Sequence, residues 1–318
     1  MRTRTLGTNG PEITIVGYGA WQAGGANWGD RAPDDDVIAA IHAAVDSGQT
    51  WIDTAEVYGK GRSEELVGRA IAGRRDDVLL FTKVAPDDEG SGIRPDEIHA
   101  AIRASLRRLG TDRVDLYQVH WPDDDVPLEE SWGAMAEVVA AGKARHIGVS
   151  NFDRARVERC HAIHPVASVQ NEFSLLEQDD RESLLPWLAE QGIGYLAYAP
   201  LASGRLSGAM HARHGFGDDD WRSGRGSFAS WREEGEEWAF DPGPLTAALD
   251  RVDAMRPIAQ SLGVPVATLA LRWALEQRGV TAAIAGSRNA EHTAGNAEAG
   301  RMTLDADVLG ELDALFSR

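Results

Sequence analysis

The chain has 318 residues, of which 43% are hydrophobic and 26% are charged, values that are ordinary for a globular protein with an ample core. Its formal net charge of -18 at pH 7 argues against a nucleic acid or an anionic membrane as partner, because neutralising phosphates requires a basic surface. No apolar run reaches the ~18 residues of a membrane span, and the start, Met1-Arg2-Thr3-Arg4, leads into no apolar signal-peptide block, so we expect a cytoplasmic protein.

The first predicted element is a β-hairpin. Residues 3 to 7 and 12 to 16 alternate in polarity around Thr8-Asn9-Gly10-Pro11, a sequence typical of a tight turn. The next strand ends in Gly17-Tyr18-Gly19-Ala20-Trp21, where the small residues allow another group to approach the backbone closely.

A repeating unit of one short apolar strand and one amphipathic helix then fills the chain. The helices show apolar residues at spacings of three and four, and several begin at a proline and end before a glycine. The predicted strands end near residues 19, 53, 83, 120, 149, 170, 198 and 285. Eight such units predict a closed (β/α)8 TIM barrel with an N-terminal β-hairpin, a long loop after strand 7 and extra C-terminal helices, in one domain spanning residues 1–318.

Residues 207–243 interrupt this pattern. The segment contains Asp218-Asp219-Asp220-Trp221 and two further tryptophans, Trp231 and Trp238. Long loops on barrels are usually functional or disordered, so the segment is either a lid or pocket wall, or a mobile surface loop.

Two other features indicate no chemistry. His211 and His214 have the spacing of metal ligands, but no third ligand stands nearby, and no metal site is expected. Cys160, the one cysteine, excludes an internal disulfide and fits a reducing compartment. It falls in an amphipathic helix, where an inert thiol is expected.

Three successive predicted strands end in ionisable side chains, namely Asp53, Lys83 and His120. The ends of parallel strands meet at one rim, which is where barrels carry function. Tyr58 follows Asp53 by five positions. A carboxylate that closes a buried strand must be paired or hydrogen-bonded, since leaving it alone costs several kcal/mol. These four residues therefore predict a proton-transfer site.

The predicted chemistry centres on Tyr58. Tyrosine titrates near pH 10, so proton exchange at neutral pH requires its pKa to fall by about 2–3 units. An ammonium at about 4 Å supplies ~4 kcal/mol at an effective dielectric of ~20, so we expect Lys83, kept charged by Asp53, to lower the pKa of Tyr58. His120 would orient a substrate carbonyl. None of these side chains supplies a hydride, which a reduced nicotinamide does.

Each residue taken alone also has a structural explanation. Asp53 fits a turn cap, Lys83 a snorkelling strand end, His120 a hydrogen-bonded core histidine and Tyr58 a packing residue. Their occurrence together at successive strand ends favours function.

With their neighbours, these residues resemble the aldo-keto reductase family over essentially the whole chain. The matching segments, in order, are Asp53-Thr54-Ala55-Glu56-Val57-Tyr58-Gly59 with Ser63-Glu64-Glu65, Thr82-Lys83, and Tyr117-Gln118-Val119-His120. The resemblance implies that Tyr58 is the general acid or base, that Lys83 and Asp53 tune it, and that His120 positions the carbonyl. We expect Trp21, Tyr58, His120 and Trp121 to line a substrate pocket for aromatic or aliphatic aldehydes and ketones.

The resemblance also implies a bound NADP. Ser150, Asn151 and Gln170 match residues that hold the nicotinamide amide, which needs both donors and acceptors, and Tyr198 matches the tyrosine that stacks on its ring. Leu201 to Leu206 would follow the pyrophosphate, and Ala285-Gly286-Ser287-Arg288, with Glu291 and Asn296, would hold the 2′-phosphate. The full predicted cofactor set is Gly19, Ala20, Trp21, Asp53, Ser150, Asn151, Gln170, Tyr198, Pro200, Leu201, Ser203, Gly204, Arg205, Gly286, Ser287, Arg288, His292 and Asn296.

Three positions depart from the well-known members of the family. An arginine or glutamine often stands where this chain has His292, a lysine where it has Gly286, and an acid where it has Arg205. The Gly-Ser-Arg form resembles bacterial branches instead. Arg288 favours NADP, and use of NAD stays open.

Two other functions remain as alternatives. One is a barrel aldolase that uses Lys83 as a Schiff-base nucleophile. The other is a cofactor-binding, redox-sensing regulatory subunit of the same fold, like the potassium-channel β-subunits. The sequence shows no extension ahead of its hairpin, so we expect an attached regulatory role less than an enzymatic one. As partners we expect a small-molecule carbonyl or alcohol, no nucleic acid, no membrane, and a monomer or small homo-oligomer.

Overall fold

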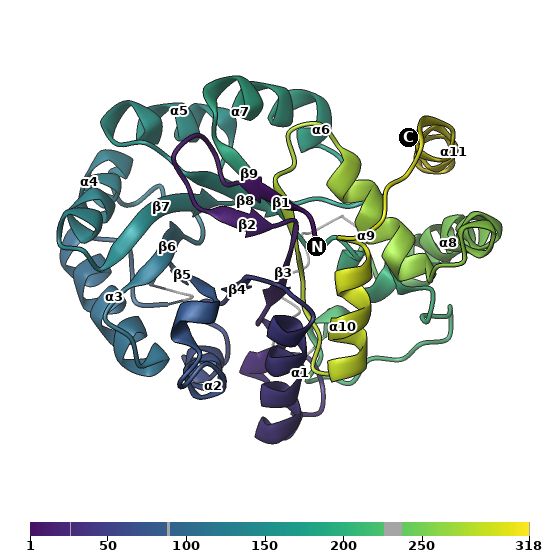
Figure 1. Cartoon of the computed structure of the whole chain (residues 1–318), viewed down its shortest axis with the longest axis horizontal. Coiled ribbons are helices and arrows are strands. Elements are labelled where there is room, and N and C mark those ends of the chain that lie inside the picture. The colour runs from purple at the N-terminus through teal and green to yellow at the C-terminus, as the bar shows by residue number, and fades with distance from the viewer. Residues whose placement is uncertain (26, 88–89, 226–236, 318) are drawn as a thin grey trace.

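The computed structural model describes residues 1–25, 27–87, 90–225 and 237–317. Eight parallel strands close into a barrel in the order β10-β3-β4-β5-β6-β7-β8-β9. Their bounds are β3 Val16–Gly19, β4 Trp51–Asp53, β5 Leu79–Val84, β6 Val114–Val119, β7 Ala144–Ser150, β8 Ser168–Glu172, β9 Gly194–Tyr198 and β10 Ala282–Ala285. The predicted TIM barrel is confirmed (Figure 1).

Helices surround this barrel and cover the outer faces of its strands (Figure 1). The α-helices are α1 Asp34–Asp46, α2 Arg62–Ala70, α3 Pro95–Leu109, α4 Leu128–Ala140, α5 Arg154–Ile163, α6 Asp180–Ser183, α7 Leu185–Gln191, α8 Pro242–Leu262, α9 Val266–Glu276, α10 Ala290–Glu298 and α11 Ala306–Phe316. The described residues also form 3-10 turns, which are η1 Gln22–Gly24, η2 Arg75–Asp77, η3 Ala202–Ser207 and η4 Trp221–Ser223.

Helix α3 shows how local sequence sets these bounds. Pro95 occupies its first turn, and the Glu97 carboxylate accepts a hydrogen bond from the Arg94 backbone N–H at 2.8 Å. Gly110 ends the helix with a φ of 65°, a left-handed conformation that glycine adopts without strain.

The predicted hairpin is also confirmed, although its strands are shorter than expected. β1 (Thr3–Thr5) pairs antiparallel with β2 (Glu12–Thr14), and the hairpin lies across one end of the barrel (Figure 1). Strand β7 begins at Ala144, which pairs with Val114 on β6.

The interior of the barrel is layered. An apolar cluster at the hairpin end contains Leu6, Ile13, Trp51, Phe81, Leu116, Leu196, Ala282 and Ile284. Trp51 needs the space beside Gly17, where an added Cβ would meet the indole at 2.1 Å. Alternate residues of a strand face the same side, so Asp53, Lys83 and Gln118 form the next layer, two residues further along their strands than Trp51, Phe81 and Leu116. The apolar layer thus separates the polar layer from the hairpin end.

The described part of the insertion after β9 is docked against the loop that follows β3. Trp28 and Asp220 form an isolated antiparallel bridge, and the Trp221 N–H donates to the Asn27 carbonyl at 3.0 Å. Trp231 lies outside the described residues. Residues 219–221 therefore belong to the rim of the barrel.

Within the described ranges, no single helix has the length and apolar character to cross a membrane. The pair α8 and α9 meets that criterion only when the two helices are taken together, and they bend by 91° at their junction.

Candidate active site

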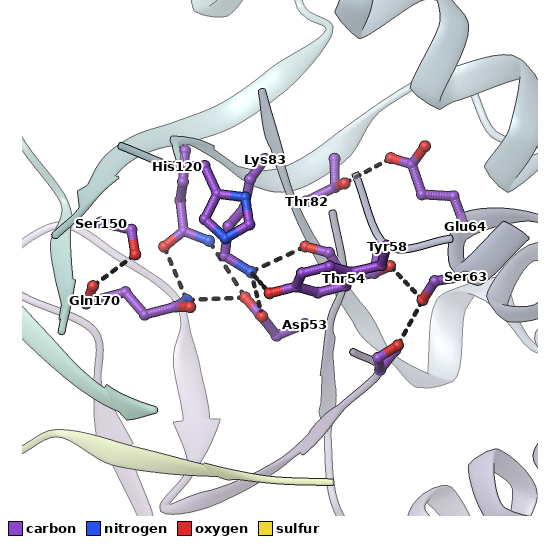
Figure 2. A network of polar contacts seen from close by, with 12 residues as sticks. Asp53, Thr54, Tyr58, Ser63, Glu64, Thr82, Lys83, His120, Ser150 and Gln170 are labelled. Atoms are coloured by element: carbon purple, nitrogen blue, oxygen red, sulfur yellow. Dashed lines mark hydrogen bonds and ion pairs between the residues drawn. The ribbon is translucent and has the colours of Figure 1, made fainter. Parts of the chain in front are cut away.

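The side chain of Lys83 is the centre of a polar cluster at the carboxyl end of the barrel (Figure 2). It is fully buried, and its Nζ forms an ion pair with Asp53 Oδ1. The same Nζ donates to the Thr54 carbonyl at 3.0 Å and lies 3.4 Å from the Tyr58 hydroxyl. The structure therefore brings Asp53, Lys83 and Tyr58 together, as their strand-end positions predicted.

The turn that carries Tyr58 is fixed at both sides. The Ser63 hydroxyl donates to the Ala20 carbonyl at 2.7 Å and shares a hydrogen bond of 2.8 Å with the Thr54 hydroxyl (Figure 2). The Ser63 N–H donates to the Tyr58 carbonyl at 3.2 Å. Gly59 packs against Gly24 so closely that a Cβ would meet the Gly24 carbonyl oxygen at 2.2 Å. These contacts connect the tyrosine to the ends of β3 and β4 and to the start of α2.

His120 completes the cluster from the end of β6. Its backbone N–H donates to the Val84 carbonyl at 2.8 Å, and its ring lies edge-on to the Tyr58 ring with centroids 5.5 Å apart. The imidazole stacks on Trp121 at 3.7 Å. Among the described residues, its buried Nδ1 has no hydrogen-bond partner. All four predicted catalytic residues thus meet at one rim.

Burial controls the protonation of this cluster. It raises the pKa of the Tyr58 hydroxyl well above its usual value, and the charge of Asp53 acts in the same direction. Burial also lowers the pKa of Lys83, which the Asp53 carboxylate opposes. Burial and the Lys83 charge hold the pKa of His120 well below its usual value, so its imidazole is neutral at pH 7.

The expectation that Lys83 lowers the pKa of Tyr58 is therefore wrong. The favourable ammonium at 3.4 Å is outweighed by removal of the phenol oxygen from water and by the carboxylate behind the lysine. The hydroxyl therefore keeps its proton at neutral pH, where an ordinary phenol is also protonated.

An aromatic wall stands beside Tyr58. The ring of Trp21 lies 6.2 Å from that of Tyr58, 4.8 Å from Trp28 and 5.7 Å from Trp221, on which it stacks with an interplanar angle of 26°. Trp21 was predicted for the substrate pocket, and the segment that holds Trp221 was predicted as a lid or pocket wall or as a mobile surface loop, whereas Trp28 was not predicted. The run Asp218-Asp219-Asp220-Trp221 in the insertion was the one available signal for this wall.

A buried ion pair supports this wall. Arg222 Nη2 and Asp220 Oδ2 are 2.6 Å apart, and the guanidinium lies over the Trp28 ring at 5.0 Å. Since Asp220 also bridges to Trp28, the insertion and the loop after β3 are connected by backbone, charge and aromatic contacts.

A second group of polar side chains lies next to the ionisable cluster. The Ser150 hydroxyl donates to the Gln170 carbonyl at 2.7 Å (Figure 2). Asn151 Nδ2 donates to the His120 carbonyl at 2.9 Å, and the Tyr198 hydroxyl donates to Asn151 Oδ1 at 2.8 Å. Gln170 Nε2 donates to Asp53 Oδ2 at 2.9 Å. These four predicted cofactor residues are thus hydrogen-bonded to the cluster and to one another.

The loop after β9 holds unusual backbone conformations. Three residues other than glycine have left-handed φ values, namely Ala199 at 47°, Ala202 at 47° and Ser203 at 56°. Such conformations cost of order 1–3 kcal/mol each and cluster at functional sites. Pro200, Leu201 and Gly204, predicted to contact the cofactor, belong to the same loop. The Arg205 guanidinium lies 5.3 Å from the centre of the Phe240 ring.

Ser287, Arg288 and His292, three of the residues predicted for the phosphate end of the cofactor, border a cavity of about 480 Å³ between the end of β10 and the start of α1, whereas Gly286, Glu291 and Asn296 are not among its lining residues. Its lining residues are Gln22, Asp30, Arg31, Ala32, Pro33, Ser287, Arg288, Asn289 and His292. Arg288 Nη1 donates to the Asp30 carbonyl at 2.5 Å. Gly286 packs against Gly19, where an added Cβ would meet the Gly19 carbonyl oxygen at 2.4 Å. Asn296 lies one turn beyond His292 on α10.

Another cavity, of about 490 Å³, lies at the hairpin end and is lined by Thr5, Thr8 and Gly279 among others. It shares no residue with the polar cluster. Because barrels carry function at the carboxyl ends of their strands, we assign the ligand to the opposite end.

The structure also places the two features that were set aside in the sequence, Cys160 and the pair of His211 and His214. Cys160 on α5 is fully buried, and burial raises the pKa of its thiol to about 12. The rings of His211 and His214 lie 5.4 Å apart, and no group of three or more His, Cys, Asp or Glu residues within the described ranges is placed to hold a metal ion.

Comparisons with known proteins agree with this geometry. The chain matches the sequence model of the Aldo/keto reductase family over residues 15–316. It is 36% identical to "Aldo-keto reductase YhdN" of Bacillus subtilis (strain 168), over 99% of this chain and 94% of that protein.

Two solved structures extend the comparison. The glycerol dehydrogenase AKR11B4 from Gluconobacter oxydans superposes with a TM-score of 0.85 and 32% identity, covering 99% of this chain and 95% of that one. An aldo/keto reductase from Klebsiella pneumoniae in complex with NADP and acetate gives a TM-score of 0.76 and 31% identity, covering 99% and 96%.

Proposed function

Because the chain belongs to the aldo/keto reductase family, we propose that it is an NADP(H)-dependent oxidoreductase that reversibly reduces aldehydes and ketones to alcohols. The observation that carries the proposal is the position of Lys83 Nζ, which lies between the Asp53 carboxylate and the Tyr58 hydroxyl at one rim of the barrel. A buried lysine in this position serves a neighbouring group that changes charge during a reaction.

The residues at the rim fit a nicotinamide dinucleotide. The Ser150, Asn151 and Gln170 side chains offer donors and acceptors to an amide, and the cavity at Ser287 and Arg288 offers an arginine and a helix start to a phosphate. The Klebsiella relative is described in complex with NADP. When bound, NADPH supplies the hydride that reaches the carbonyl carbon.

Tyr58 would supply the proton. The phenol is protonated at neutral pH and would donate to the carbonyl oxygen as negative charge develops there. The phenolate that remains lies 3.4 Å from the Lys83 ammonium, an attraction of about 5 kcal/mol at an effective dielectric of ~20. This attraction is absent while the phenol is neutral, so it favours the transition state over the ground state.

Asp53 and His120 would have supporting roles. The Asp53 carboxylate opposes the effect of burial and keeps the lysine charged. The neutral His120 imidazole offers one N–H to the carbonyl oxygen, beside the Tyr58 ring. Two donors converging on one oxygen fix its position and polarise the carbonyl.

The aromatic wall suggests the kind of substrate. Trp21 packs against Trp28 and Trp221 and gives an apolar surface next to Tyr58. Such a surface suits carbonyl compounds with an aliphatic or aromatic body. The Gluconobacter relative is described as a glycerol dehydrogenase, so small polyols belong among the compounds tested.

The structure argues against the aldolase alternative. A Schiff base requires an accessible, uncharged amine, whereas Lys83 is fully buried and its Nζ contacts Asp53, Thr54 and Tyr58. Borohydride trapping of a substrate on Lys83 would revive that alternative. The regulatory-subunit alternative, the single domain, the cytoplasmic location, and the monomeric or small oligomeric state stay predictions.

A panel of aldehydes, ketones and alcohols assayed with NADPH and with NADH tests the proposal. We expect carbonyl-dependent loss of the reduced-nicotinamide absorbance, with a lower KM for NADPH than for NADH. Binding of NADPH without turnover of any compound would instead favour the regulatory function, and failure to bind either nucleotide would refute the proposal.

A further inference from the structure

Gln118 is a fully buried amide inside the barrel, in the layer of Asp53 and Lys83. It stands on β6, where it pairs with Lys83 on β5 and with Gly148 on β7. An amide left without partners in such a place costs roughly 2–7 kcal/mol. Its two side-chain hydrogen bonds both go to residues of the proposed active site, Asp53 and Gln170.

These hydrogen bonds form a closed triangle. Gln118 Nε2 donates to Asp53 Oδ2 at 3.3 Å, and Gln170 Nε2 donates to the same oxygen at 2.9 Å. Gln170 Nε2 also donates to Gln118 Oε1 at 3.2 Å. Gln118 is thus a donor to the carboxylate and an acceptor from the second amide.

The triangle fixes which way the Gln170 amide faces. Its nitrogen has two hydrogens, and Asp53 Oδ2 and Gln118 Oε1 take both. Its oxygen accepts no hydrogen bond from any residue that the structure describes, and so it remains available as an acceptor. Without the acceptor on Gln118, the Gln170 amide would be held by Asp53 Oδ2 alone and would lose one of the two hydrogen bonds that fix its orientation.

In the same triangle, the two carboxylate oxygens of Asp53 have different partners. Oδ1 pairs with Lys83, whereas Oδ2 receives only neutral amide donors. The two amides satisfy the hydrogen-bonding capacity of Oδ2 without bringing a second cation, so Lys83 is the cation that the Asp53 carboxylate pairs with.

The neighbouring strands pack closely around this amide. A Cβ added to Gly148 would lie 2.8 Å from the Ser168 carbonyl oxygen and 3.4 Å from Gln118 Cγ, so β7 and β8 close tightly around the side chain.

We propose that Gln118 is a positioning residue that presents the Gln170 amide oxygen to the carboxamide NH2 of a nicotinamide cofactor and holds Asp53 in place for Lys83. The inference rests on the proposed function, since the cofactor is the ligand that Gln170 would meet. Gln118 itself touches neither cofactor nor substrate. Its effect reaches the reaction through Gln170 and Asp53.

Two substitutions test the two halves of this role. Gln118→Met keeps the length of the side chain and removes both hydrogen bonds. We expect the NADPH dissociation constant, measured by fluorescence titration, to rise about tenfold, which corresponds to ~1.4 kcal/mol. Gln118→Glu places a second carboxylate beside Asp53, and we expect the basic limb of the pH profile of kcat to move to higher pH, because added negative charge holds protons on Lys83 and Tyr58.

Gln49→Met is the matched control. Gln49 is also buried, but its amide donates to the Thr293 carbonyl at 3.3 Å and to Ser47 Oγ at 3.4 Å, away from the triangle. This variant should keep the NADPH affinity and the pH profile of the wild type. Should Gln118→Met fail to fold, Gln118→Asn keeps the amide but shortens its reach, and the same loss of affinity is expected.

The outcomes separate this inference from the proposed function. Folded Gln118 variants whose NADPH affinity and pH profile match the wild type within twofold would overturn the role of Gln118 while leaving carbonyl reduction intact. A wild-type protein that neither binds NADPH nor reduces a carbonyl would overturn the proposed function, and the inference with it.

Discussion

Removing the ion pair of Lys83 and Asp53 should change stability and activity in different ways. In Lys83→Met the buried Asp53 carboxylate loses its cation, and breaking a buried pair in this way costs ~3–5 kcal/mol of the free energy of unfolding. The double variant Asp53→Asn with Lys83→Met removes both charges and leaves neutral groups. We therefore expect the double variant to recover most of the lost stability.

Activity should not recover with it. The ammonium lies 3.4 Å from the Tyr58 hydroxyl, which gives about 5 kcal/mol at an effective dielectric of ~20. We expect the loss of this attraction to lower kcat by at least about two orders of magnitude. Both the single and the double variant should show at least this loss.

Urea unfolding and steady-state carbonyl reduction measure the two effects. Lys143→Met, on the turn before β7, is the control for replacing a lysine by methionine, and it should leave both quantities unchanged. A double variant with wild-type turnover would show that the lysine charge is not needed, and would refute the reasoning.

Three further predictions concern neighbouring residues. Because the folded pKa of His120 is depressed, the unfolded chain binds a proton below pH ~6.5 that the folded chain does not, so stability is lost as pH falls, by up to ~1.4 kcal/mol per pH unit. In His120→Asn, urea unfolding from pH 7 to 4.5 should show a free energy of unfolding that falls less steeply with decreasing pH than in the wild type. An unchanged dependence on pH would contradict this. Trp221→Leu should raise kcat/KM for bulky aromatic aldehydes relative to small ones. Trp187 packs on Arg154 instead, so the control Trp187→Leu should leave this selectivity unchanged. The same selectivity in Trp221→Leu and in the wild type would show that Trp221 does not form the wall. Arg288→Ala should raise the KM for NADPH about tenfold or more and leave that for NADH unchanged, since only NADPH offers a phosphate there; equal changes in both values would exclude this role.

The barrel and its ionisable rim could be predicted because both follow from periodic patterns. Parallel strands end at one edge, so Asp53, Lys83 and His120 had to meet once their segments were identified as successive strands. Tyr58 followed from its short distance in sequence from Asp53.

Gln118 was missed although the sequence contained a signal. Residues two apart on a strand face the same side, so Leu116 and Gln118 share the inner face of β6, and His120 directly follows the end of that strand. A polar residue between a core leucine and the rim histidine is an exception to an otherwise apolar face. The exception marks a residue whose partners must also lie inside the barrel.

The contact between Trp21 and Trp221 and the direction of the Tyr58 pKa could not be predicted. Trp221 reaches Trp21 through the docking of a long insertion onto a distant loop, and no local pattern encodes that contact. The pKa depends on the balance between burial and charge, and the residue types alone do not give the depth of burial.

The most direct test of the account is the rate of NADPH-dependent carbonyl reduction by Tyr58→Phe. This variant keeps the ring and its contacts with Trp21 and His120 and loses only the hydroxyl next to Lys83. We predict wild-type affinity for NADPH and a kcat lower by at least two orders of magnitude. Turnover close to that of the wild type would contradict the central claim that this phenol delivers the proton.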